Sequence, residues 1–276
     1  MRRSVETIAG VATPVLSAGP EGAAEAVVCL HGNPGSSADW FDLTPRAGAF
    51  ARVVAPDMPG FGAAGKSAAF DYSPQGYTRH LDALLTRLGV ARAHLVLHDF
   101  GVAWGLGWAA ANPARVASLT LVNIGWLPDY RWHALARLWR TPVLGELSMA
   151  TVNRPAFDLL LKQGNPRGLP RAFVDGMWSH YDAGTRRAVL RLYRATDALG
   201  EVAESGALRR LDAPVCVIWG AADPYVPVAY AQRQREVFAR AEVTIFPDSG
   251  HWPHADNPER FAEVVVPFLK RSLMQS

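Results

Sequence analysis

Three polar side chains, each just after a short apolar run, could together carry out covalent hydrolysis. They are Asp99, Asp223 and His251. Each apolar run predicts a buried strand, and side chains at the carboxyl ends of parallel strands gather at one edge of the sheet. We therefore expect a site in which Asp99 is the nucleophile, His251 is the base and Asp223 is the acid that orients His251.

The segment around Asp99 predicts a sharp turn from a strand into a helix. Gly101, Gly105 and Gly107 would let that helix pack closely against the strand, which leaves the side chain of the turn exposed above the sheet. A serine ordinarily stands at such a turn, but the chain contains no Gly-x-Ser-x-Gly sequence. The alternative is that Asp99 only caps the helix that begins at Gly101.

The other two candidates also have simpler explanations. Asp223 precedes Pro224, and Asp-Pro commonly begins a turn. His251 follows Gly250 after the last predicted strand, and His254 is close enough in sequence to compete for the role of base. Because all three positions coincide with strand ends, the catalytic interpretation is the stronger one.

A fourth segment, His31-Gly-Asn-Pro, directly follows the first predicted parallel strand. In hydrolases with a nucleophile on a strand-to-helix turn, this position supplies one backbone N–H of the oxyanion hole, and the residue after the nucleophile supplies the other. We assign these two donors to Asn33 and Phe100. An ordinary turn is the alternative.

The elements that must position these residues alternate between strands and helices. Nearly continuous apolar runs predict strands at Ala26–Leu30, Arg52–Ala55, His94–Leu97, Ser118–Val122, Val215–Trp219 and Glu242–Phe246. Helical patterns cover Pro74–Leu88, Gly101–Ala111, Val228–Ala239 and Pro258–Leu273. This alternation predicts an α/β fold with a mostly parallel, doubly wound sheet.

One interval breaks the alternation. Residues 125–211 contain no good strand pattern, but they are rich in Trp, Arg and Leu and look helical. An interval of this length is too long for a loop within a compact domain. We interpret it as a helical cap inserted into a core domain formed by residues 1–124 and 212–276.

Composition narrows the class of protein. Of the 276 residues 49% are hydrophobic, and the net charge of +3 is not gathered in a basic run, so we expect a small-molecule substrate and neither a nucleic acid nor a membrane as partner. No metal-ligand spacing or phosphate-binding glycine loop occurs, so we expect no metal and no organic cofactor.

Cys29 and Cys216 lie in predicted strands, which favours buried free thiols. Arg2 and Arg3 lead into no apolar stretch, which favours a soluble cytoplasmic enzyme; the oligomeric state stays open.

Three motifs resemble those of the α/β-hydrolase superfamily, and most closely its aspartate-nucleophile branch, the epoxide hydrolases and haloalkane dehalogenases. They are the turn His31–Pro34, the elbow His98–Gly101 and the pair Gly250-His251, with Asn257-Pro258 at the start of the last helix. The resemblance covers essentially the whole chain. It implies an α/β-hydrolase fold with a helical cap and a covalent alkyl-enzyme ester on Asp99.

Within this branch, epoxide hydrolases bind the epoxide oxygen with tyrosines of the cap. One such tyrosine lies in a segment that ends Trp-Tyr-Arg, and Leu192-Tyr193-Arg194 is similar, so the resemblance assigns this role to Tyr193. No motif identifies a second tyrosine, and Tyr130 and Tyr181 are candidates by location only. An amphipathic aromatic at a cap surface is the alternative for either.

Haloalkane dehalogenases hold the halide with a side-chain amide of the His-Gly-Asn-Pro turn and an indole N–H beside the nucleophile. Asn33 matches the amide, but Phe100 replaces the indole. Candidate substitutes for the indole are Trp104, Trp126 and Trp132. Epoxide hydrolases usually have a small residue at the first position of this elbow, whereas this chain has Leu97 there.

We therefore predict an epoxide hydrolase-like enzyme that acts on a moderately apolar small molecule. Asp99 attacks an epoxide carbon, Tyr193 donates a hydrogen bond to the alkoxide, and His251 activates the water that hydrolyses the ester. The first alternative is a haloalkane dehalogenase with the same triad. The second is a non-catalytic ligand-binding protein on the hydrolase scaffold, which would not need all three triad residues.

Overall fold

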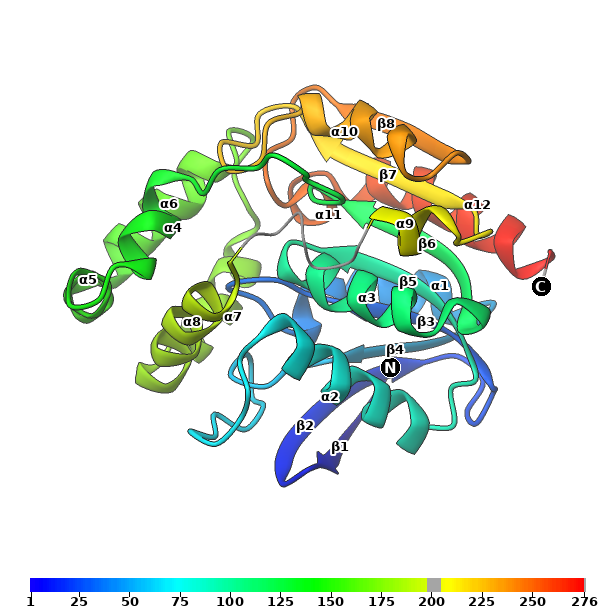
Figure 1. The fold of residues 1–276 in the computed structure, drawn as a ribbon, viewed down its shortest axis with the longest axis horizontal. Coiled ribbons are helices and arrows are strands. Elements are labelled where there is room, and N and C mark those ends of the chain that lie inside the picture. Colours follow the sequence, from blue (N-terminus) through cyan, green and yellow to red (C-terminus); the bar gives the residue numbers. More distant parts are fainter. Residues whose placement is uncertain (198–204, 276) are drawn as a thin grey trace.

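The computed structural model of the protein describes residues 1–197 and 205–275, with an eight-stranded sheet at its centre (Figure 1). The strands are β1 (Arg2–Ile8), β2 (Val11–Ala18), β3 (Glu25–Leu30), β4 (Arg52–Pro56), β5 (Arg92–His98), β6 (Val116–Val122), β7 (Val215–Gly220) and β8 (Ala241–Phe246). They lie in the order β1-β2-β4-β3-β5-β6-β7-β8. β3 to β8 are parallel, and β1 and β2 are antiparallel to their neighbours. The mostly parallel sheet is confirmed.

The β1–β2 hairpin is the part of the sheet that the sequence patterns miss. β1 is an edge strand in which only Ile8 is buried, and its remaining residues are polar or exposed. Because such a strand packs little apolar surface, it lacks the continuous apolar run that marks the central strands. The six predicted strands are all present, each slightly longer than expected.

Alternate residues of the strands face two different cores, one on each side of the sheet. The helices that cover these cores are α1 (Leu43–Gly48), α2 (Pro74–Arg87), α3 (Phe100–Ala111) and α12 (Pro258–Leu273). Val28 and Leu95 belong to the core under α2 and α3, whereas Val27 and Val96 belong to the core under α1 and α12. Figure 1 shows α2 and α3 in front of the sheet. Helices on both faces confirm the doubly wound arrangement.

Cys29 and Cys216 are buried and free in the core under α1 and α12, as predicted. The predicted helix Val228–Ala239 is wrong in its length. Helix α10 (Ala229–Arg233) is followed by a 3-10 turn, Gln234–Glu236. Gln234 is fully buried, and its side-chain amide accepts from the backbone N–H of Trp126 and donates to the Trp126 carbonyl. No local pattern encodes this distant contact.

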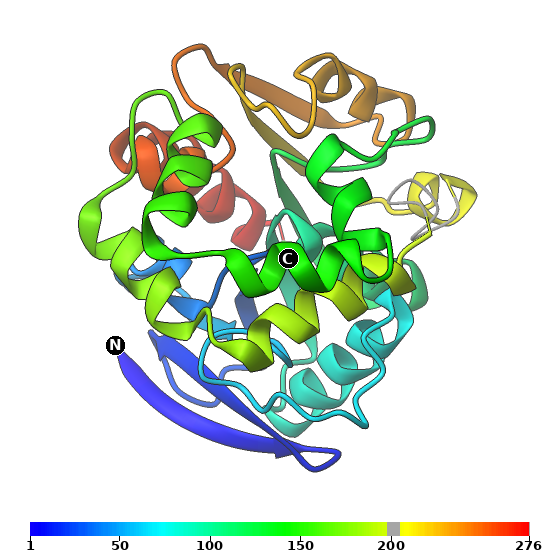
Figure 2. The ribbon, with the colours of Figure 1, turned by 90° about the vertical axis from the view of Figure 1, so that its left-hand side faces the viewer.

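Between β6 and β7 the described residues form helices and no strand. These are α4 (Ala134–Arg140), α5 (Leu144–Thr151), α6 (Arg154–Gly164), α7 (Arg171–His180), α8 (Ala183–Ala195) and α9 (Ser205–Arg209). Helices α4 to α8 lie beyond the carboxyl ends of the parallel strands, and Figure 2 shows them across the front of the molecule. Helix α9 packs against α3 instead. The cap and its boundaries at 125 and 211 stay a prediction.

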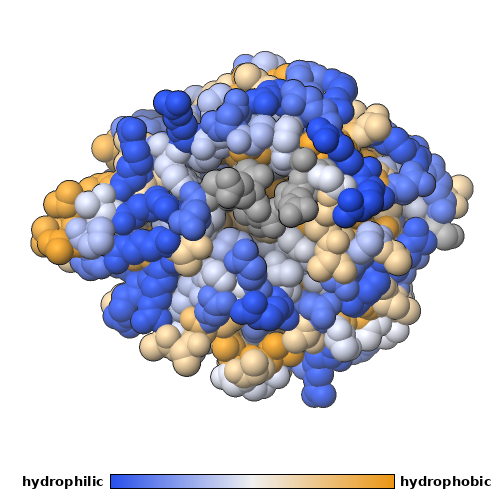
Figure 3. Space-filling model, in the orientation of Figure 1, coloured by the Kyte–Doolittle hydropathy of each residue, from blue (hydrophilic) through white to orange (hydrophobic). Residues whose placement is uncertain are grey.

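The helices α4 to α8 present an apolar tip to solvent. Val143, Leu144 and Leu147 are 67%, 51% and 57% exposed, and the surface at this tip is hydrophobic (Figure 3).

In the part of the chain that the structure describes, no helix is both long enough and apolar enough to span a bilayer.

Candidate active site

Asp99 sits on a strained turn between β5 and α3. Its φ of +48° and ψ of −127° fall in a region that residues with a side chain rarely adopt. The surroundings are tightly packed, because a Cβ on Gly101 would lie 2.5 Å from the Leu30 carbonyl oxygen, and one on Gly32 would lie 2.2 Å from Cβ of Asp99. The two glycines therefore allow the turn after β3 and the start of α3 to hold Asp99 from both sides.

The two oxygens of the Asp99 carboxylate have different surroundings. Oδ1 accepts a hydrogen bond from the backbone N–H of Asn33 (2.7 Å), whereas Oδ2 lies 3.6 Å from Nε2 of His251. Burial alone would raise the pKa of Asp99, but His251, with smaller contributions from His98 and the Asn33 N–H, outweighs this effect and lowers the pKa. Phe100 is the first residue of α3, where a backbone N–H has no partner within the helix.

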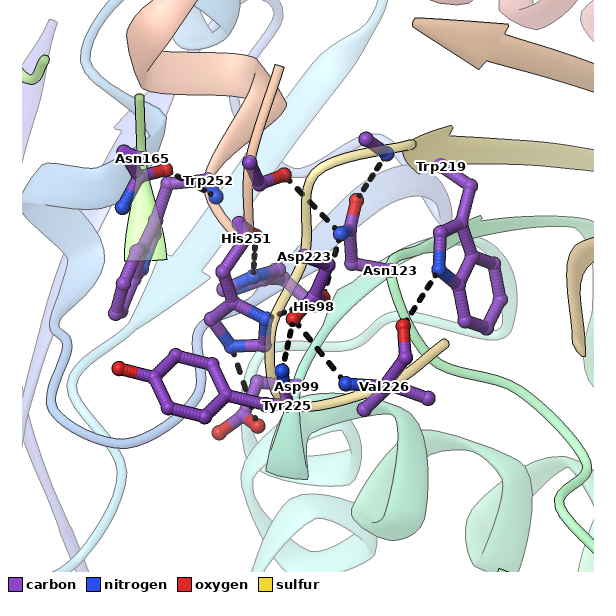
Figure 4. Close-up of polar contacts among 12 residues, drawn as sticks. His98, Asp99, Asn123, Asn165, Trp219, Asp223, Tyr225, Val226, His251 and Trp252 are labelled. Atoms are coloured by element: carbon purple, nitrogen blue, oxygen red, sulfur yellow. Dashed lines mark hydrogen bonds and ion pairs between the residues drawn. The ribbon is translucent and has the colours of Figure 1, made fainter. Parts of the chain in front are cut away.

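His251 is oriented by Asp223 (Figure 4). Nδ1 of His251 lies 2.7 Å from Oδ2 of Asp223, and Oδ1 of Asp223 accepts from the backbone N–H groups of Tyr225 (2.7 Å) and Val226 (3.1 Å). A carboxylate acceptor fixes a proton on Nδ1 and leaves Nε2 for the Asp99 side. Burial opposes charge on this ring, but the carboxylates of Asp223 and Asp99 raise the pKa of His251 above its usual value.

Asn123 completes this network, and the sequence analysis did not identify it. It follows β6 with a φ of +56°. Its side-chain N–H₂ donates to Oδ2 of Asp223 (2.7 Å) and to the Gly250 carbonyl (3.1 Å), and its Oδ1 accepts from the Gly220 N–H (2.9 Å). Asn123 therefore fixes the acid relative to the loop that carries His251. The available signal was a polar residue directly after a predicted strand at the same edge of the sheet.

A pocket opens over Asp99 and His251, with about 610 Å³ of space that includes open solvent. Its lining residues are Asn33, Pro34, Asp99, Phe100, Ile124, Trp132, His133, Leu135, Trp139, Phe157, Leu160, Leu161, Tyr181, Tyr193, Tyr225, Val226, His251 and Trp252. Most of these side chains are apolar or aromatic, and the polar groups gather near Asp99. Such a lining suits a largely apolar small molecule.

Tyr193 of α8 lines this pocket and is 4% exposed. Its hydroxyl oxygen accepts a long hydrogen bond from the side-chain N–H₂ of Asn33 (3.4 Å). A phenol that accepts in this way keeps its own proton for another partner. Burial, with the charge of Asp99, raises the pKa of Tyr193 well above its usual value, so the hydroxyl is a neutral donor.

His133 lines the same pocket and was also missed. Its Nδ1 accepts from the backbone N–H of Ala136 (3.2 Å) as the N-cap of α4, so the proton of the neutral ring lies on Nε2. Burial lowers the pKa of His133 to about 4, which keeps the ring neutral. His133 thus offers a further N–H donor. Its only sequence signal was a polar residue just before a helical pattern.

Of the two further tyrosines that were candidates for the pocket, one lines it and the other does not. Tyr181 lines the pocket, but its hydroxyl donates to Sδ of Met149 (3.2 Å). Tyr130 is not among the lining residues, and its hydroxyl donates to the Tyr225 carbonyl (3.1 Å). Neither tyrosine therefore joins Tyr193 as a donor in this arrangement.

None of the three candidate tryptophans supplies a free indole N–H to the pocket beside Asp99. Trp104 is fully buried outside the pocket and stacks on Tyr77 with 4.2 Å between ring centroids. Trp132 lines the pocket, but its indole N–H donates to the Asp197 carbonyl (3.2 Å). Trp126 is not a lining residue.

His254, which the sequence offered as a competitor of His251 for the role of base, is not a lining residue of the pocket either.

One large group of enzymes combines such a strand order with a turn like that at Asp99 and an acid–histidine pair like Asp223–His251. A family model described as alpha/beta hydrolase family matches residues 27–264. The chain belongs to the alpha/beta hydrolase family. In this family the carboxyl ends of the strands carry the reacting groups, which is where Asp99, Asp223 and His251 meet.

Relatives of this alpha/beta hydrolase carry names for several activities. A cis-3-alkyl-4-alkyloxetan-2-one decarboxylase from Xanthomonas campestris pv. campestris is 28% identical, and the match covers 95% of this chain and 94% of the relative. A haloalkane dehalogenase from Mesorhizobium japonicum is 32% identical over 67% of this chain and 62% of the relative. Hydrolytic chemistry is thus supported, whereas the substrate differs among relatives.

Solved structures share the fold of this alpha/beta hydrolase over its whole length. The haloalkane dehalogenase DbeA from Bradyrhizobium elkani superposes with a TM-score of 0.86 at 24% identity, covering 100% of this chain and 99% of that chain. The epoxide hydrolase CorEH superposes with a TM-score of 0.79 at 19% identity, covering 97% and 99%. At these identities the likeness shows the fold alone.

Proposed function

We propose that this alpha/beta hydrolase opens epoxides, with Asp99 as its nucleophile. The observation that carries the proposal is the Tyr193 hydroxyl, which shares a pocket with the Asp99 carboxylate and keeps its proton because it accepts from Asn33. An epoxide requires both groups, a nucleophile for its carbon and a neutral acid for its ring oxygen. The largely apolar lining suits a moderately apolar substrate.

In the first half-reaction, Oδ2 of Asp99 bonds to an epoxide carbon while the ring C–O bond breaks. The electron pair moves to the ring oxygen, which takes the Tyr193 proton and accepts a hydrogen bond from Nε2–H of His133. Oδ1 stays on the backbone N–H of Asn33, so only Oδ2 is free to attack. The product of this step is an ester between the substrate and Asp99.

In the second half-reaction, water attacks Cγ of Asp99 and gives its proton to Nε2 of His251. The charges of Asp223 and Asp99 raise the pKa of His251 in the free enzyme, and ester formation removes the charge of Asp99. His251 then becomes the stronger acid and its proton passes to the Tyr193 phenolate, which restores the phenol and prepares His251 to act as base. The oxyanion on Oδ1 is stabilised by Asn33 and Phe100. As it collapses, the ester C–O bond breaks, the leaving alkoxide takes the proton of the hydroxyl added to Cγ, and the diol leaves Asp99 as a carboxylate.

A haloalkane dehalogenase is the second candidate, because the side-chain amide of Asn33 also lines the pocket. A leaving halide needs neutral N–H donors and no acid. The relative from Mesorhizobium japonicum, named a haloalkane dehalogenase, adds weight to this candidate. Against it, the Asn33 amide already donates to Tyr193, and the Trp132 indole donates to the Asp197 carbonyl.

Replacement of Tyr193 by phenylalanine separates the two activities. Loss of one donor to a developing oxyanion lowers a rate on the order of 10²–10³-fold, so Tyr193→Phe should lose this much kcat/KM with epoxides. Bromide release from short bromoalkanes should stay within a few-fold of wild type. Tyr130→Phe is the matched control, because Tyr130 is not a lining residue and its hydroxyl donates to the backbone carbonyl of Tyr225.

The assay compares terminal epoxides, short bromoalkanes and a cis-3,4-dialkyloxetan-2-one. The last is included because the relative from Xanthomonas campestris is named for such a ring. The epoxide proposal fails if the wild type releases bromide, ignores epoxides and is insensitive to Tyr193→Phe. Failure of the wild type on all three classes would favour the non-catalytic alternative.

A further inference from the structure

A second polar cluster lies beside the triad and outside the substrate pocket. Asp39, His98 and His254 each offer a ligand atom, and these atoms all lie within 4.8 Å of one another. The three residues are 7%, 0% and 4% exposed. Among the described residues, no hydrogen-bond partner exists for Oδ2 of Asp39, Nδ1 of His98 or either nitrogen of His254. Buried polar atoms without partners are rare and demand an explanation.

The orientation of the His98 ring follows from its one hydrogen bond. Nε2 lies 2.8 Å from the backbone carbonyl oxygen of His251, which can only accept (Figure 4). The ring proton is therefore on Nε2, and Nδ1 presents a lone pair to the cluster. Metal-ligating histidines typically donate their second N–H to a carbonyl or carboxylate, which fixes the tautomer and the ring direction.

The other two side chains are also held in place. The His254 ring stacks on Trp40 with 4.7 Å between centroids and an interplanar angle of 24°. The Asp39 carboxylate uses Oδ1 to accept from the Ser36 N–H (3.2 Å), which leaves Oδ2 for the cluster. Two imidazole nitrogens and one carboxylate oxygen therefore converge.

The cluster is close to solvent on one side. A surface groove is lined by residues that include Ser36, Asp39, Phe173, Met177 and His254. It runs between the 3-10 turn Ser37–Trp40, helix α7 and the start of α12. Asp39 and His254 belong to both the groove and the cluster, so the groove reaches the edge of the cluster. The groove thus provides an entry path for a small ion.

We propose that Asp39, His98 and His254 bind a divalent transition-metal cation of zinc-like chemistry. Two imidazoles and a carboxylate are a ligand set that zinc accepts, with water in the fourth position. Metal–ligand distances of about 2.0–2.1 Å place tetrahedral ligand atoms roughly 3.4 Å apart, so the side chains close on the ion by about 1 Å at most. The site lies outside the pocket and does not depend on the proposed epoxide reaction.

The ion positions part of the catalytic loop. It binds Nδ1 of the ring whose Nε2 holds the His251 carbonyl, and so it fixes that loop against β5. The three ligands are widely separated in the chain, which is why no metal-ligand spacing is visible in the sequence. The sequence-based expectation of no metal is the one that this proposal replaces.

The test is titration of the metal-stripped full chain with Zn²⁺ against a chromophoric chelator, and with Co²⁺ as a spectroscopic probe. Wild type should bind one equivalent of either ion, show visible Co²⁺ absorption bands and gain several degrees in melting temperature with Zn²⁺. His254→Phe keeps the ring stacked on Trp40 and should bind at least tenfold more weakly. Asp39→Asn should weaken binding similarly, and it covers the case in which His254→Phe does not fold.

Two controls test other histidines. His251→Gln removes the triad ring, and His180→Gln removes a histidine of α7 outside the cluster; both should bind Zn²⁺ as wild type does. Absence of binding in wild type at 100 μM Zn²⁺ would overturn the proposal. So would an unchanged affinity for Zn²⁺ in both His254→Phe and Asp39→Asn, or loss of binding in His251→Gln, which would place the ion at the triad.

Discussion

As the proposed nucleophile, Asp99 would differ from the serine expected at such a turn in the carbon that water attacks. A serine ester is hydrolysed at the acyl carbon of the substrate, whereas an aspartyl ester is hydrolysed at Cγ of the enzyme itself. The oxyanion donors must then face the nucleophile, and the Asn33 N–H does so at 2.7 Å from Oδ1 of Asp99. At the scale of single residues, this contact favours a substrate with an electrophilic sp³ carbon over an ordinary ester.

His251→Gln should permit the first half-reaction and stop the second, because an amide cannot take the proton of water. The alkyl-enzyme then accumulates, and the intact-protein mass should rise by the mass of the epoxide, with the adduct on Asp99. Asp99→Asn is the control and should stay unmodified, since the asparagine side chain is nearly isosteric with aspartate but its amide is a poor nucleophile. An unmodified His251→Gln protein, with a substrate that wild type turns over, would contradict the two-step scheme.

Residues were predictable where their signal is local. Asp99, Asp223 and His251 each follow an apolar run, and the structure places both carboxylates within ion-pair distance of the His251 ring. Asn123 also follows a predicted strand directly, but an amide is not itself an acid, a base or a nucleophile, and His133 follows no strand. The role of Asn123 depends on Asp223, a residue 100 positions away, and that of His133 depends on a helix cap turned toward the pocket.

At the scale of elements, a large side chain of β5, Leu97, packs against a glycine of α3, Gly105. Leu97 stands where the epoxide hydrolase pattern has a small residue, and a Cβ on Gly105 would lie 2.4 Å from Cδ2 of Leu97. The strand side chain is large because the facing helix position has none. The departure from the pattern at Leu97 is thus accommodated without moving the turn that carries Asp99.

Gly105→Ala should destabilise the protein by about 1–3 kcal/mol through overpacking, and Leu97→Val in the same chain should recover part of this loss. Urea unfolding of the wild type, both single variants and the double variant measures the coupling free energy. Gly176→Ala on α7 is the control, because its Cβ would meet nothing within 4 Å. If the two substitutions are additive within about 0.5 kcal/mol, they do not share the space.

Elements were predictable in proportion to their burial. The central strands β3 and β5 to β7 are almost entirely buried, and their continuous apolar runs were visible in the sequence. The edge strand β1 buries only Ile8 and gave no such run. Helix α10 ended early because the buried Gln234 bonds to Trp126, a contact that no local periodicity reports.

At the scale of the whole molecule, buried histidines connect stability to pH. Burial lowers the pKa of six of them: His31, His80, His94, His98, His133 and His254. As the pH falls, the unfolded chain therefore binds protons on these rings before the folded chain does. Their contribution to the free energy of unfolding is fully present above the usual histidine pKa of 6.5 and is lost as the pH falls below it.

His80 lies outside the pocket and outside the proposed metal site, so a change at His80 tests this effect without disturbing either. It is 4% exposed, its Nε2 lies 3.0 Å from Oγ1 of Thr13, and burial lowers its pKa to about 4. Between pH 6.5 and pH 4, wild type should lose up to about 1.4 kcal/mol per pH unit through this ring. His80→Phe keeps a ring beside Phe70 and removes the titration, so its free energy of unfolding should fall less steeply across that window.

Urea unfolding at half-unit steps from about pH 8 to pH 4 gives both curves. Above about pH 7 they should run parallel, because neither the folded nor the unfolded chain then gains a proton at His80. The difference in slope should open only below pH 6.5, where the unfolded chain binds the proton and the folded chain does not. Equal slopes from pH 6.5 to pH 4 would mean that folded His80 binds its proton as readily as the unfolded chain does. In that case the Thr13 hydroxyl would have to accept a hydrogen bond from a charged ring in an otherwise buried site.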